Sequence, residues 1–517
     1  MERMPSIFND VLSPVTPGPS SSNTCGPYRI ARLARALLGE PPRRITVRMA
    51  RRGGYYDTFY SMHSHEAILA ALLGQELLRC DLSTMCRQAD EAGLCYDFQF
   101  VDDLPVRPSE LAEMELSGDR RTIRLTGVSL GGGEIEMTEL EGFPLCLRGN
   151  EDGALFIGPD GLGRAVFEER LGALSGFSCV KDGERTLYLC LAGKPFPDGA
   201  DMPGLEMFPV RNILGNKLAD AEPLFSTLAA MAEMAGGDLP GLIERYEARR
   251  SGTGRDEVRA AVLHHWEVMK ASMADGLAGK SDMLAGLVPG DAGFRLARRV
   301  ESGQALSGRT IGMAVARALA VMENNGSMRC VVAAPTAGAC GVLPGAILSV
   351  AEERGLSDDA IVDGLLVAAA VGVLVAMRAP ISGAIGGCQS EIGVASAMTA
   401  AGLAQLGGGT PEQVIHAAAI ALKNLLGLIC DPVAGPVEIP CIKRNAVGVS
   451  NAFAAADMAL AGIASRIPPD EVVDALINVQ GLLHPDLRGN LRGGLASTAT
   501  GRALKDEWYA RMKRMQA

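Results

Sequence analysis

Residues 360–377 read AIVDGLLVAAAVGVLVAM, and this stretch decides the fold class of the larger part of the chain. Its apolar run from Gly364 to Met377 is 14 residues long, whereas a helix that crosses a bilayer needs about 20 apolar residues. The stretch therefore predicts a helix buried in the core of a folded domain, and no membrane is expected as a partner.

Four further stretches have helical periodicity and are separated by glycine-rich breaks. Few strand signals accompany them from about residue 212 onward, and the composition shifts to Ala, Gly, Leu and Met. We therefore expect residues 212–517 to form an all-helical domain whose loops carry the chemistry. The four stretches are PLFSTLAAMAEMA (223–235), TIGMAVARALAVMENN (310–325), PEQVIHAAAIALKNLLGLI (411–429) and NAFAAADMALAGIAS (451–465).

The first 200 residues show a different pattern, in which strand-like runs alternate with short helices. A helix is expected over Pro27–Leu38, and Gly131–Gly133 marks the turn between two later strands. These features predict an α/β domain over residues 1–150. Residues 151–200 continue as strand, helix, strand and strand, and a stretch rich in Pro and Gly places a linker at 201–211. The predicted fold class is multidomain, with the α/β domain and a short segment preceding the helical domain.

Composition limits the partners of the chain. It is 48 % hydrophobic over 517 residues with a formal net charge of −11, which indicates a globular protein of about two or three domains. The arginines within 29–52 fit a solvated helix face and strand edge, so nucleic acid is not expected as a partner. The N-terminal MERMPSIFND lacks the apolar core of a signal peptide. A reducing cytoplasm is therefore expected, where the twelve cysteines serve packing, metal ligation or reactivity.

Three of these cysteines lie in segments of tight backbone. Cys388 lies in SGAIGGCQSEIG (382–393), and Cys430 and Cys441 lie in LLGLICDPVAGPVEIPCIKRN (425–445). Their spacings of 42 and 11 residues do not match the short pairs of zinc ribbons or bacterial ferredoxins. Soft thiolates select iron–sulfur clusters, zinc or copper. The context predicts a metal site, and buried structural thiols are the alternative.

Five long segments carry a resemblance to a known family. Through them residues 302–505 resemble the catalytic portion of the iron–sulfur-dependent L-serine dehydratases (L-serine ammonia-lyases). The N-terminal half resembles the other portion of that family more weakly, through GPSSSNT (18–24) and TGVSLGGGEIEMTELEGF (126–143). The five segments are APTAGACG (334–341), SGAIGGCQSEIG (382–393), LKNLLGLICDPVAGPVEIPCIKRNA (422–446), ADMALAGIASRIPPDEV (456–472) and GGLASTATGR (493–502).

The resemblance implies a fused chain with an allosteric substrate-binding-like domain, a degenerate ACT-like segment at 151–200 and the helical catalytic domain. It implies that Cys388, Cys430 and Cys441 ligate a [4Fe–4S] cluster with one open iron, which would act as a Lewis acid on the substrate hydroxyl. The implied activity is conversion of L-serine to pyruvate and ammonia. Family members commonly associate, so a homodimer is expected.

The chain departs from the family at two histidine positions. Asn23 stands in the SSSNT run where the family's opening has a histidine, and an Asn cannot exchange a proton near neutral pH. A second family motif of the GHGTD type corresponds here to Met62–Glu66 (MHSHE). His63 is the best match for the catalytic base and His65 is the alternative. The pair could instead be surface histidines that cap the following helix.

The remaining site candidates are substrate-binding residues. A run ahead of a helix could bind a carboxylate through hydroxyl and N–H groups, or could simply be a helix N-cap cluster. Residues beside the thiols could contact substrate, and the basic ones among them could instead offset the charge of a cluster. The run is Ser20, Ser21, Ser22, Asn23 and Thr24, and the residues beside the thiols are Ser382, Gln389, Lys443, Arg444 and Asn445.

Other reactive residues are expected to be structural. Cys340 is expected to pack near the thiols rather than ligate, and Asp431 with Pro432 is interpreted as a helix stop after Cys430. The same structural role is expected of His264, His265, His416 and His484.

Two rival functions stay open. One is a relative that acts on another β-hydroxy or β-thio amino acid, because Asn23 changes the predicted pocket. The other is a non-catalytic sensor that binds an amino acid or a cluster and regulates a partner.

Overall fold

The computed structural model describes residues 5–51, 53–105, 110–197, 200–215 and 222–516. The chain forms two compact units. The helical unit consists of Met1–Thr24, Gly131–Gly133 and Ala219–Ala517, and the sheet unit consists of Cys25–Leu130 and Glu134–Leu218.

The helical unit contains most of the α-helices of the chain. Its elements, with η for 3₁₀- and π-helices, are η1 (Ile7–Val11), β1 (Val15–Pro17), η2 (Ser21–Cys25, at the boundary), α6 (Leu228–Met234), α7 (Leu239–Ser251), α8 (Arg255–Leu277), α9 (Ala292–Glu301), α10 (Gly308–Gly326), β12 (Cys330–Val332), η4 (Ala337–Ala339), α11 (Val342–Arg354), α12 (Asp358–Arg378), α13 (Gly383–Gly386), η5 (Gln389–Gly393), α14 (Val394–Leu406), α15 (Pro411–Asn424), α16 (Cys441–Leu460), α17 (Pro469–Leu482), η6 (Pro485–Leu487), η7 (Gly494–Ser497) and α18 (Ala499–Gln516).

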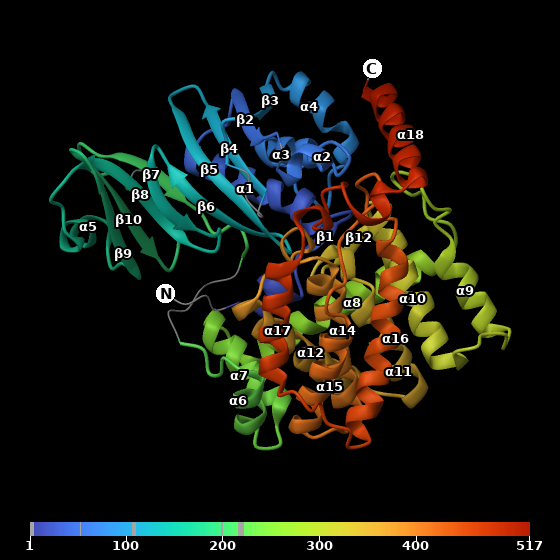
Figure 1. Cartoon of the computed structure of the whole chain (residues 1–517). Helices are drawn as coiled ribbons and strands as arrows, with labels where there is room; N and C mark the ends of the chain where they lie inside the picture. Colours follow the sequence, from blue (N-terminus) through green and yellow to red (C-terminus); the bar gives the residue numbers. More distant parts are fainter. Residues whose placement is uncertain (1–4, 52, 106–109, 198–199, 216–221, 517) are drawn as a thin grey trace. The chain divides into compact units, whose positions relative to one another are not determined.

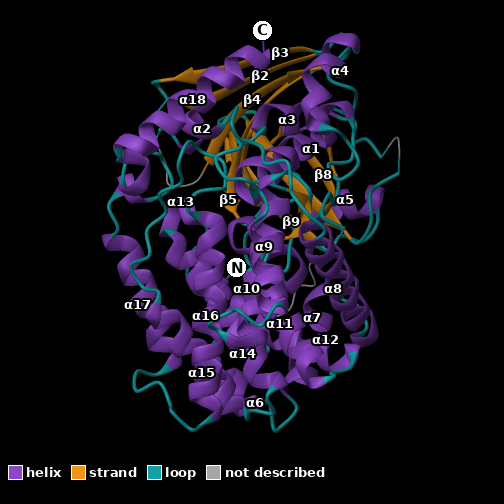
Figure 2. Ribbon diagram, turned by 90° about the vertical axis from the view of Figure 1, so that its right-hand side faces the viewer, coloured by secondary structure: helices purple, strands orange, loops and turns teal. Residues whose placement is uncertain are grey.

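Helix α14 lies in the core of this unit. It packs against α12, α15, α16 and α11, and both views draw it among α12, α15 and α16 (Figure 1 and Figure 2). Its residues from Val394 to Ala404 are all buried, and its five alanines and one glycine let neighbouring helices approach closely. The predicted core helix is α12: it is long and apolar enough to cross a bilayer, but 83 % of its apolar window is buried inside the protein.

The unit is not entirely helical, because the N-terminus adds a strand to it. Strand β1 pairs antiparallel with β12, with Val15 opposite Val332. The buried carboxylate of Glu247 accepts hydrogen bonds from Ser6 Oγ and the Ile7 N–H at 2.7 and 3.0 Å. The expectation that residues 1–150 form one α/β domain therefore differs from the structure at its start. Short strands such as VTP and CVV carry too little periodicity to predict a pairing across more than 300 residues.

The sheet unit contains the larger sheets and five α-helices among its described residues. Its elements are α1 (Gly26–Leu38), β2 (Arg44–Ala50), α2 (Gly54–Thr58), α3 (Ser64–Leu73), η3 (Leu82–Thr84), α4 (Met85–Glu91), β3 (Cys95–Val101), β4 (Glu110–Ser117), β5 (Thr122–Gly131), β6 (Glu134–Leu140), β7 (Phe143–Leu147), β8 (Asp152–Pro159), α5 (Arg164–Leu171), β9 (Gly176–Asp182), β10 (Arg185–Ala192) and β11 (Glu206–Val210).

Its larger sheet has six strands in the order β3-β2-β4-β5-β6-β7. Strands β2 and β3 are parallel, whereas β2 with β4 and β4 with β5 are antiparallel. Helix α1 packs on this sheet where Gly127 leaves room for Ile30, since a Cβ at Gly127 would lie 2.3 Å from Ile30 Cγ2. Residue propensity does not predict strand β4, because its ELAEMELS segment is rich in good helix formers.

The smaller sheet has four antiparallel strands in the order β11-β8-β10-β9. Helix α5 covers it through Phe167, which packs among Phe156, Phe177 and Tyr188. Strand β11 lies within residues 201–211, so the prediction that this segment is a linker is wrong. Phe208 and Val210 are buried in the sheet, so buried side chains alternate along β11. The prolines and glycines before β11 favoured a linker over this strand pattern.

We predict that Gly345→Ala destabilises the protein and Gly481→Ala does not. Both glycines lie inside helices, α11 and α17, but a Cβ at Gly345 would lie 2.6 Å from the Ala314 carbonyl oxygen of α10. Overpacking of this kind costs about 1–3 kcal/mol. Apart from its chain neighbours and the nearby backbone of α17, no atom of the described residues lies within 4 Å of a Cβ at Gly481, where Ala raises helix propensity and adds up to about 1 kcal/mol. Melting temperatures of the two variants test this; equal shifts would contradict the close packing of α10 on α11.

Candidate metal centre

The three predicted thiols come from three different backbone settings. Cys388 follows Gly387, whose φ of 78° makes the sharp bend after α13, and directly precedes η5. Cys430 forms an isolated bridge with Arg488, and its N–H and C=O bond to Leu487 O and Gly489 N at 2.8 and 2.7 Å. Cys441 is the first residue of α16. Each thiol is thus fixed by local backbone structure.

These settings bring the thiols together. The sulfurs of Cys388 and Cys430 and a carboxylate oxygen of Glu391 all lie within 4.8 Å of one another. Cys388 and Cys441 are 2 % and 8 % exposed. The hydrogen bond and charge of Cys388 and burial raise the pKa of Cys430 well above its usual value, and burial, Cys388 and Glu391 do the same for Cys441. The sulfurs of Cys388 and Cys430 therefore lie close together, and Cys441 is near enough to interact with Cys388; a metal ion bound there would favour the deprotonated thiols.

Two glycines keep the space around Cys430 open. A Cβ at Gly383 would lie 3.2 Å from Cys430 Sγ and 2.4 Å from a Glu391 oxygen. A Cβ at Gly489, which has a φ of 81°, would lie 3.3 Å from the same sulfur. The glycine-rich backbone that surrounds the thiols in the sequence is therefore needed for access to this sulfur.

Arg444 supplies the positive charge of the site. Its Nη1 lies 3.4 Å from Cys388 Sγ and donates to Ile429 O at 2.8 Å, and its Nη2 pairs with Asp431 Oδ1 at 2.8 Å. Asp431 is 3 % exposed and its other oxygen accepts from the Leu495 N–H at 2.8 Å. Burial lowers the pKa of Arg444, but Cys388 and Asp431 outweigh it and the pKa is raised. The guanidinium of Arg444 therefore interacts with Cys388 and forms an ion pair with Asp431.

A chain of contacts connects the thiols to the N-terminal serine run. Glu391 lies 3.9 Å from Cys388 Sγ through Oε2 and accepts from Thr336 Oγ1 at 2.8 Å through Oε1. Burial raises the pKa of this carboxyl group. The next residue, Ala337, donates its N–H to Ser21 Oγ at 3.3 Å. All of these residues belong to the helical unit, so the sequence-predicted loop and the thiols share one neighbourhood.

Residues 210–496, more than half of the chain, match the family model "Serine dehydratase alpha chain". The chain belongs to this family. A probable L-serine dehydratase, alpha chain, from Bacillus subtilis (strain 168) is 48 % identical over 255 residues, 49 % of this chain and 84 % of that protein.

Two further relatives bear the same kind of name. The probable L-serine dehydratase, alpha chain, of Latilactobacillus sakei is 50 % identical over 192 residues, 37 % of this chain and 92 % of that protein. L-serine dehydratase TdcG of Escherichia coli (strain K12) is 39 % identical over 276 residues, 52 % of this chain and 60 % of that protein. The predicted resemblance to L-serine dehydratases, which are lyases, is confirmed, and the matched residues of the family model include all three thiols.

The serine run is folded as a short π-helix, η2, that continues into α1. The Asn23 N–H donates to Ser20 Oγ at 3.1 Å, which is a capping interaction. Ser21, Asn23 and Thr24 are buried, and Ser20 and Ser22 are partly exposed. Both interpretations of the run thus have support: Ser20 caps η2, and Ser21 is bonded toward the thiol neighbourhood. A role of the run in substrate binding stays a prediction.

The candidates beside the thiols divide by their hydrogen bonds. Gln389 bonds to Gly386 O at 2.9 Å and Gly427 N at 2.8 Å, and Asn445 bonds to the backbone of Gly338, Gly341 and Cys441 at 2.9–3.1 Å. These amides hold the thiol-bearing loops in place. The predicted substrate contacts of these residues stay untested, as do those of Ser382, which is 3 % exposed and precedes α13, and Lys443, which is exposed on α16.

His63 and His65 lie in the sheet unit beside Glu66. His63 is the residue before α3, has a φ of 56°, and directs Nδ1 to Glu66 Oε2. The side chains of His63 and His65 are only 16 % and 8 % exposed, and His63 makes no side-chain cap bond. The alternative of surface histidines that cap α3 is therefore wrong for these buried side chains.

Two charged residues were not predicted as parts of the site. Asp431 was interpreted as a helix stop, but α15 ends at Asn424 and Asp431 is the ion-pair partner of Arg444. Glu391 lies three residues after Cys388, and this spacing was the available signal. Cys340 matches its prediction as a packing residue, since its Sγ lies 3.6 Å from Met322 Sδ in the core.

We predict that Arg444→Gln destabilises the protein and Lys443→Gln does not. Removal of one partner of a buried ion pair leaves Asp431 with an uncompensated charge, which costs about 3–5 kcal/mol. Lys443 is the neighbouring cation on α16 but is exposed, so its replacement changes stability by about 0.5 kcal/mol or less. Thermal melts of the metal-free variants provide the measurement. Similar melting temperatures for both would show that Asp431 does not depend on Arg444.

Proposed function

We propose that this chain is a [4Fe–4S]-dependent enzyme that converts L-serine to pyruvate and ammonia. Its membership of the serine dehydratase alpha chain family and the names of its relatives support the substrate. The observation that carries the proposal is the close approach of Cys388 and Cys430 beside the guanidinium of Arg444, with Cys441 near enough to interact with Cys388.

The residues present fit a cluster on three counts. Three soft sulfur donors meet at one buried point, which is the donor set that iron–sulfur clusters use. Gly383 and Gly489 keep the region around Cys430 Sγ free of side chains. Arg444 places a cation against Cys388, where it offsets the negative charge of thiolates. Cys388, Cys430 and Cys441 would hold the cluster.

When bound, a cluster held by three thiolates supplies an iron with an open position, a Lewis acid that stabilises charge on a departing hydroxyl oxygen. The residues of the chain position the rest of the substrate. The hydroxyl and N–H groups of Ser20–Thr24 bind its carboxylate. Their nearness to the thiols supports this role: Ser21 accepts a hydrogen bond from Ala337, and the preceding residue, Thr336, donates one to Glu391.

His63 is the proposed base for the Cα proton. Its Nδ1 faces Glu66, so Nε2 is the ring nitrogen that accepts the proton. Loss of that proton and of the β-hydroxyl group releases water. Water then returns in the hydrolysis that yields pyruvate and ammonia, so the net reaction consumes L-serine alone.

The proposal extends to the sheet unit and the assembly. The order β11-β8-β10-β9, with α5 as the one helix among the described residues of 151–200, supports a degenerate ACT-like segment. A homodimer in the cytoplasm remains part of the proposal. The alternative substrate is another β-hydroxy or a β-thio amino acid. Asn23 supports this alternative because it lies in the proposed carboxylate-binding loop, where its N–H donates to Ser20 Oγ.

We predict that Cys430→Ala loses most iron and turnover after anaerobic reconstitution, whereas Cys340→Ala keeps both. Both cysteines are enclosed by the helical unit, but Cys340 packs against Met322 instead of the other thiols. Iron and sulfide per chain and pyruvate formed from L-serine provide the measurements. A screen of β-substituted L-amino acids on the reconstituted wild-type chain identifies a different substrate.

Three outcomes separate the candidates. Full iron content in Cys430→Ala would refute the proposed ligand set. Iron without turnover of any amino acid in the wild-type chain would support the sensor instead. Stoichiometric zinc without iron would reject both.

We predict that His63→Ala lowers kcat by roughly 10²–10⁴-fold, the usual contribution of a general base, while iron content stays at the wild-type value. The matched control is His264→Ala, because His264 is exposed on α8. Exchange of the Cα proton of L-serine with deuterated solvent provides a second readout. Unchanged exchange in His63→Ala would assign the base to another residue.

A further inference from the structure

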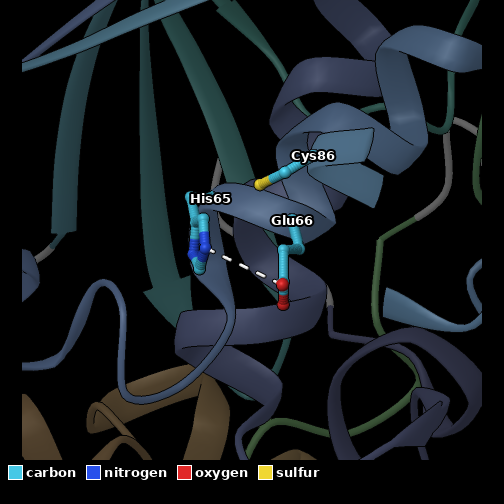
Figure 3. A group of neighbouring side chains, drawn as sticks. All are labelled: His65, Glu66 and Cys86. Carbon is cyan, nitrogen blue, oxygen red and sulfur yellow. Dashed lines mark ion pairs between the residues drawn. The ribbon is translucent and has the colours of Figure 1, made fainter. Parts of the chain in front are cut away.

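Helices α3 and α4 of the sheet unit bring three metal-ligand types together. His65 and Glu66 lie at the start of α3 and Cys86 lies on α4 (Figure 3). One ligand atom of each lies within 4.8 Å of the other two. Figure 3 shows the imidazole, the carboxylate and the sulfur around one small region.

The surroundings of His65 favour a ligand role. The residue is 6 % exposed and packs among the rings of Phe59, Tyr60 and Phe98. Its Nε2 is the ring nitrogen that faces Glu66, so the ring presents that nitrogen to the other two donors. Burial lowers the pKa of His65 to about 4, so its imidazole is neutral at pH 7, the form that binds metals.

The spacing of the donors suits a small ion. His65 Nε2 lies 3.9 Å from Glu66 Oε1. Zinc binds imidazole nitrogen and carboxylate oxygen at about 2.0–2.2 Å, so one ion reaches both atoms with little movement. A His, Glu and Cys donor set combines borderline and soft ligands, which favours Zn²⁺ over Mg²⁺ or Ca²⁺.

Outer partners hold two of the three donors. Glu66 Oε2 is engaged by His63 Nδ1, which leaves Oε1 toward His65. Cys86 interacts with the hydroxyl of Tyr96 and the nearby charge of Asp90. Carboxylates that ligate a metal are typically hydrogen-bonded by an outer partner, which is the position of His63 relative to Glu66.

We infer that His65, Glu66 and Cys86 form a Zn²⁺-binding site in the sheet unit, with His63 as the outer partner of Glu66. Bound zinc polarises the Glu66 carboxylate and thereby restrains the His63 ring that is hydrogen-bonded to it. A consequence, which rests on the proposed function, is that zinc inhibits removal of the Cα proton. Zinc binding itself does not depend on that function.

Cobalt titration tests the site without using activity. The background is the full chain with Cys388, Cys430 and Cys441 all changed to Ser, so that the thiol cluster cannot bind the probe. We expect about one equivalent of Co²⁺ with a thiolate-to-cobalt charge-transfer band, lost on adding Cys86→Ser and kept on adding Cys80→Ser. Cys80 is the matched control, because it is also a half-buried cysteine of the sheet unit. His63→Ala should weaken binding by roughly 10–100-fold, as loss of an outer partner does.

The wild-type chain provides a second measurement. Iodoacetamide labelling followed by mass spectrometry should show that Zn²⁺ protects Cys86 and leaves the labelling of Cys80 unchanged. A cobalt band that survives Cys86→Ser, or equal labelling of Cys86 with and without Zn²⁺, overturns the inference. If His63→Ala loses turnover but binds cobalt at the His65, Glu66 and Cys86 site with unchanged affinity, only the outer role of His63 is overturned.

Discussion

The helical unit depends on one electrostatic constraint: several groups that carry or can acquire negative charge are buried around a single guanidinium. Cys388 and Asp431 contact Arg444 directly, and the remaining thiols and Glu391 interact with one another. Buried charges are tolerated only when they are paired. Without Arg444, the buried carboxylate of Asp431 would lose its ion-pair partner. The site therefore needs the first turn of α16, which supplies both Cys441 and Arg444 three residues apart on one helix face.

The second constraint concerns the N-terminus, which the helical unit holds through contacts far apart in sequence. Strand β1 pairs with β12, and Asn325 Nδ2 donates to Pro19 O at 2.9 Å. Gly18 must be a glycine because a Cβ there would lie 1.8 Å from the Asn325 carbonyl oxygen. The serine run is thus positioned by the unit that carries the thiols, although it directly precedes the first helix of the sheet unit. The Gly131–Gly133 turn follows the same rule, since Gly131 packs against Ser382.

The sequence predicted what local pattern controls. Periodicity located α12, α15 and α16, and a Gly-rich turn located Gly131–Gly133. Long-range pairings carry no such pattern, so the β1–β12 pairing and β11 were missed. At the site, residue type predicted the thiols, but the role of Asp431 could not be predicted. Its partner is Arg444, and a loop rather than a helix separates Asp431 from α15. Propensity misled at β4, where tertiary pairing overrides helix-forming residues.

The two histidines beside Glu66 show how environment can separate similar side chains. His65 is enclosed by aromatic rings, and a shift of its pKa from 6.5 to about 4 means that its protonated form is disfavoured by roughly 3 kcal/mol. A base that must hold the Cα proton near neutral pH cannot bear that penalty. His63 is more exposed, and its Nδ1 faces the Glu66 carboxylate, which orients the ring. Its left-handed φ costs of order 1–3 kcal/mol, and strain of this kind concentrates at functional positions. Burial and strain therefore favour His63 over His65 as the proposed base, and leave His65 suited to the neutral state that a metal ligand requires.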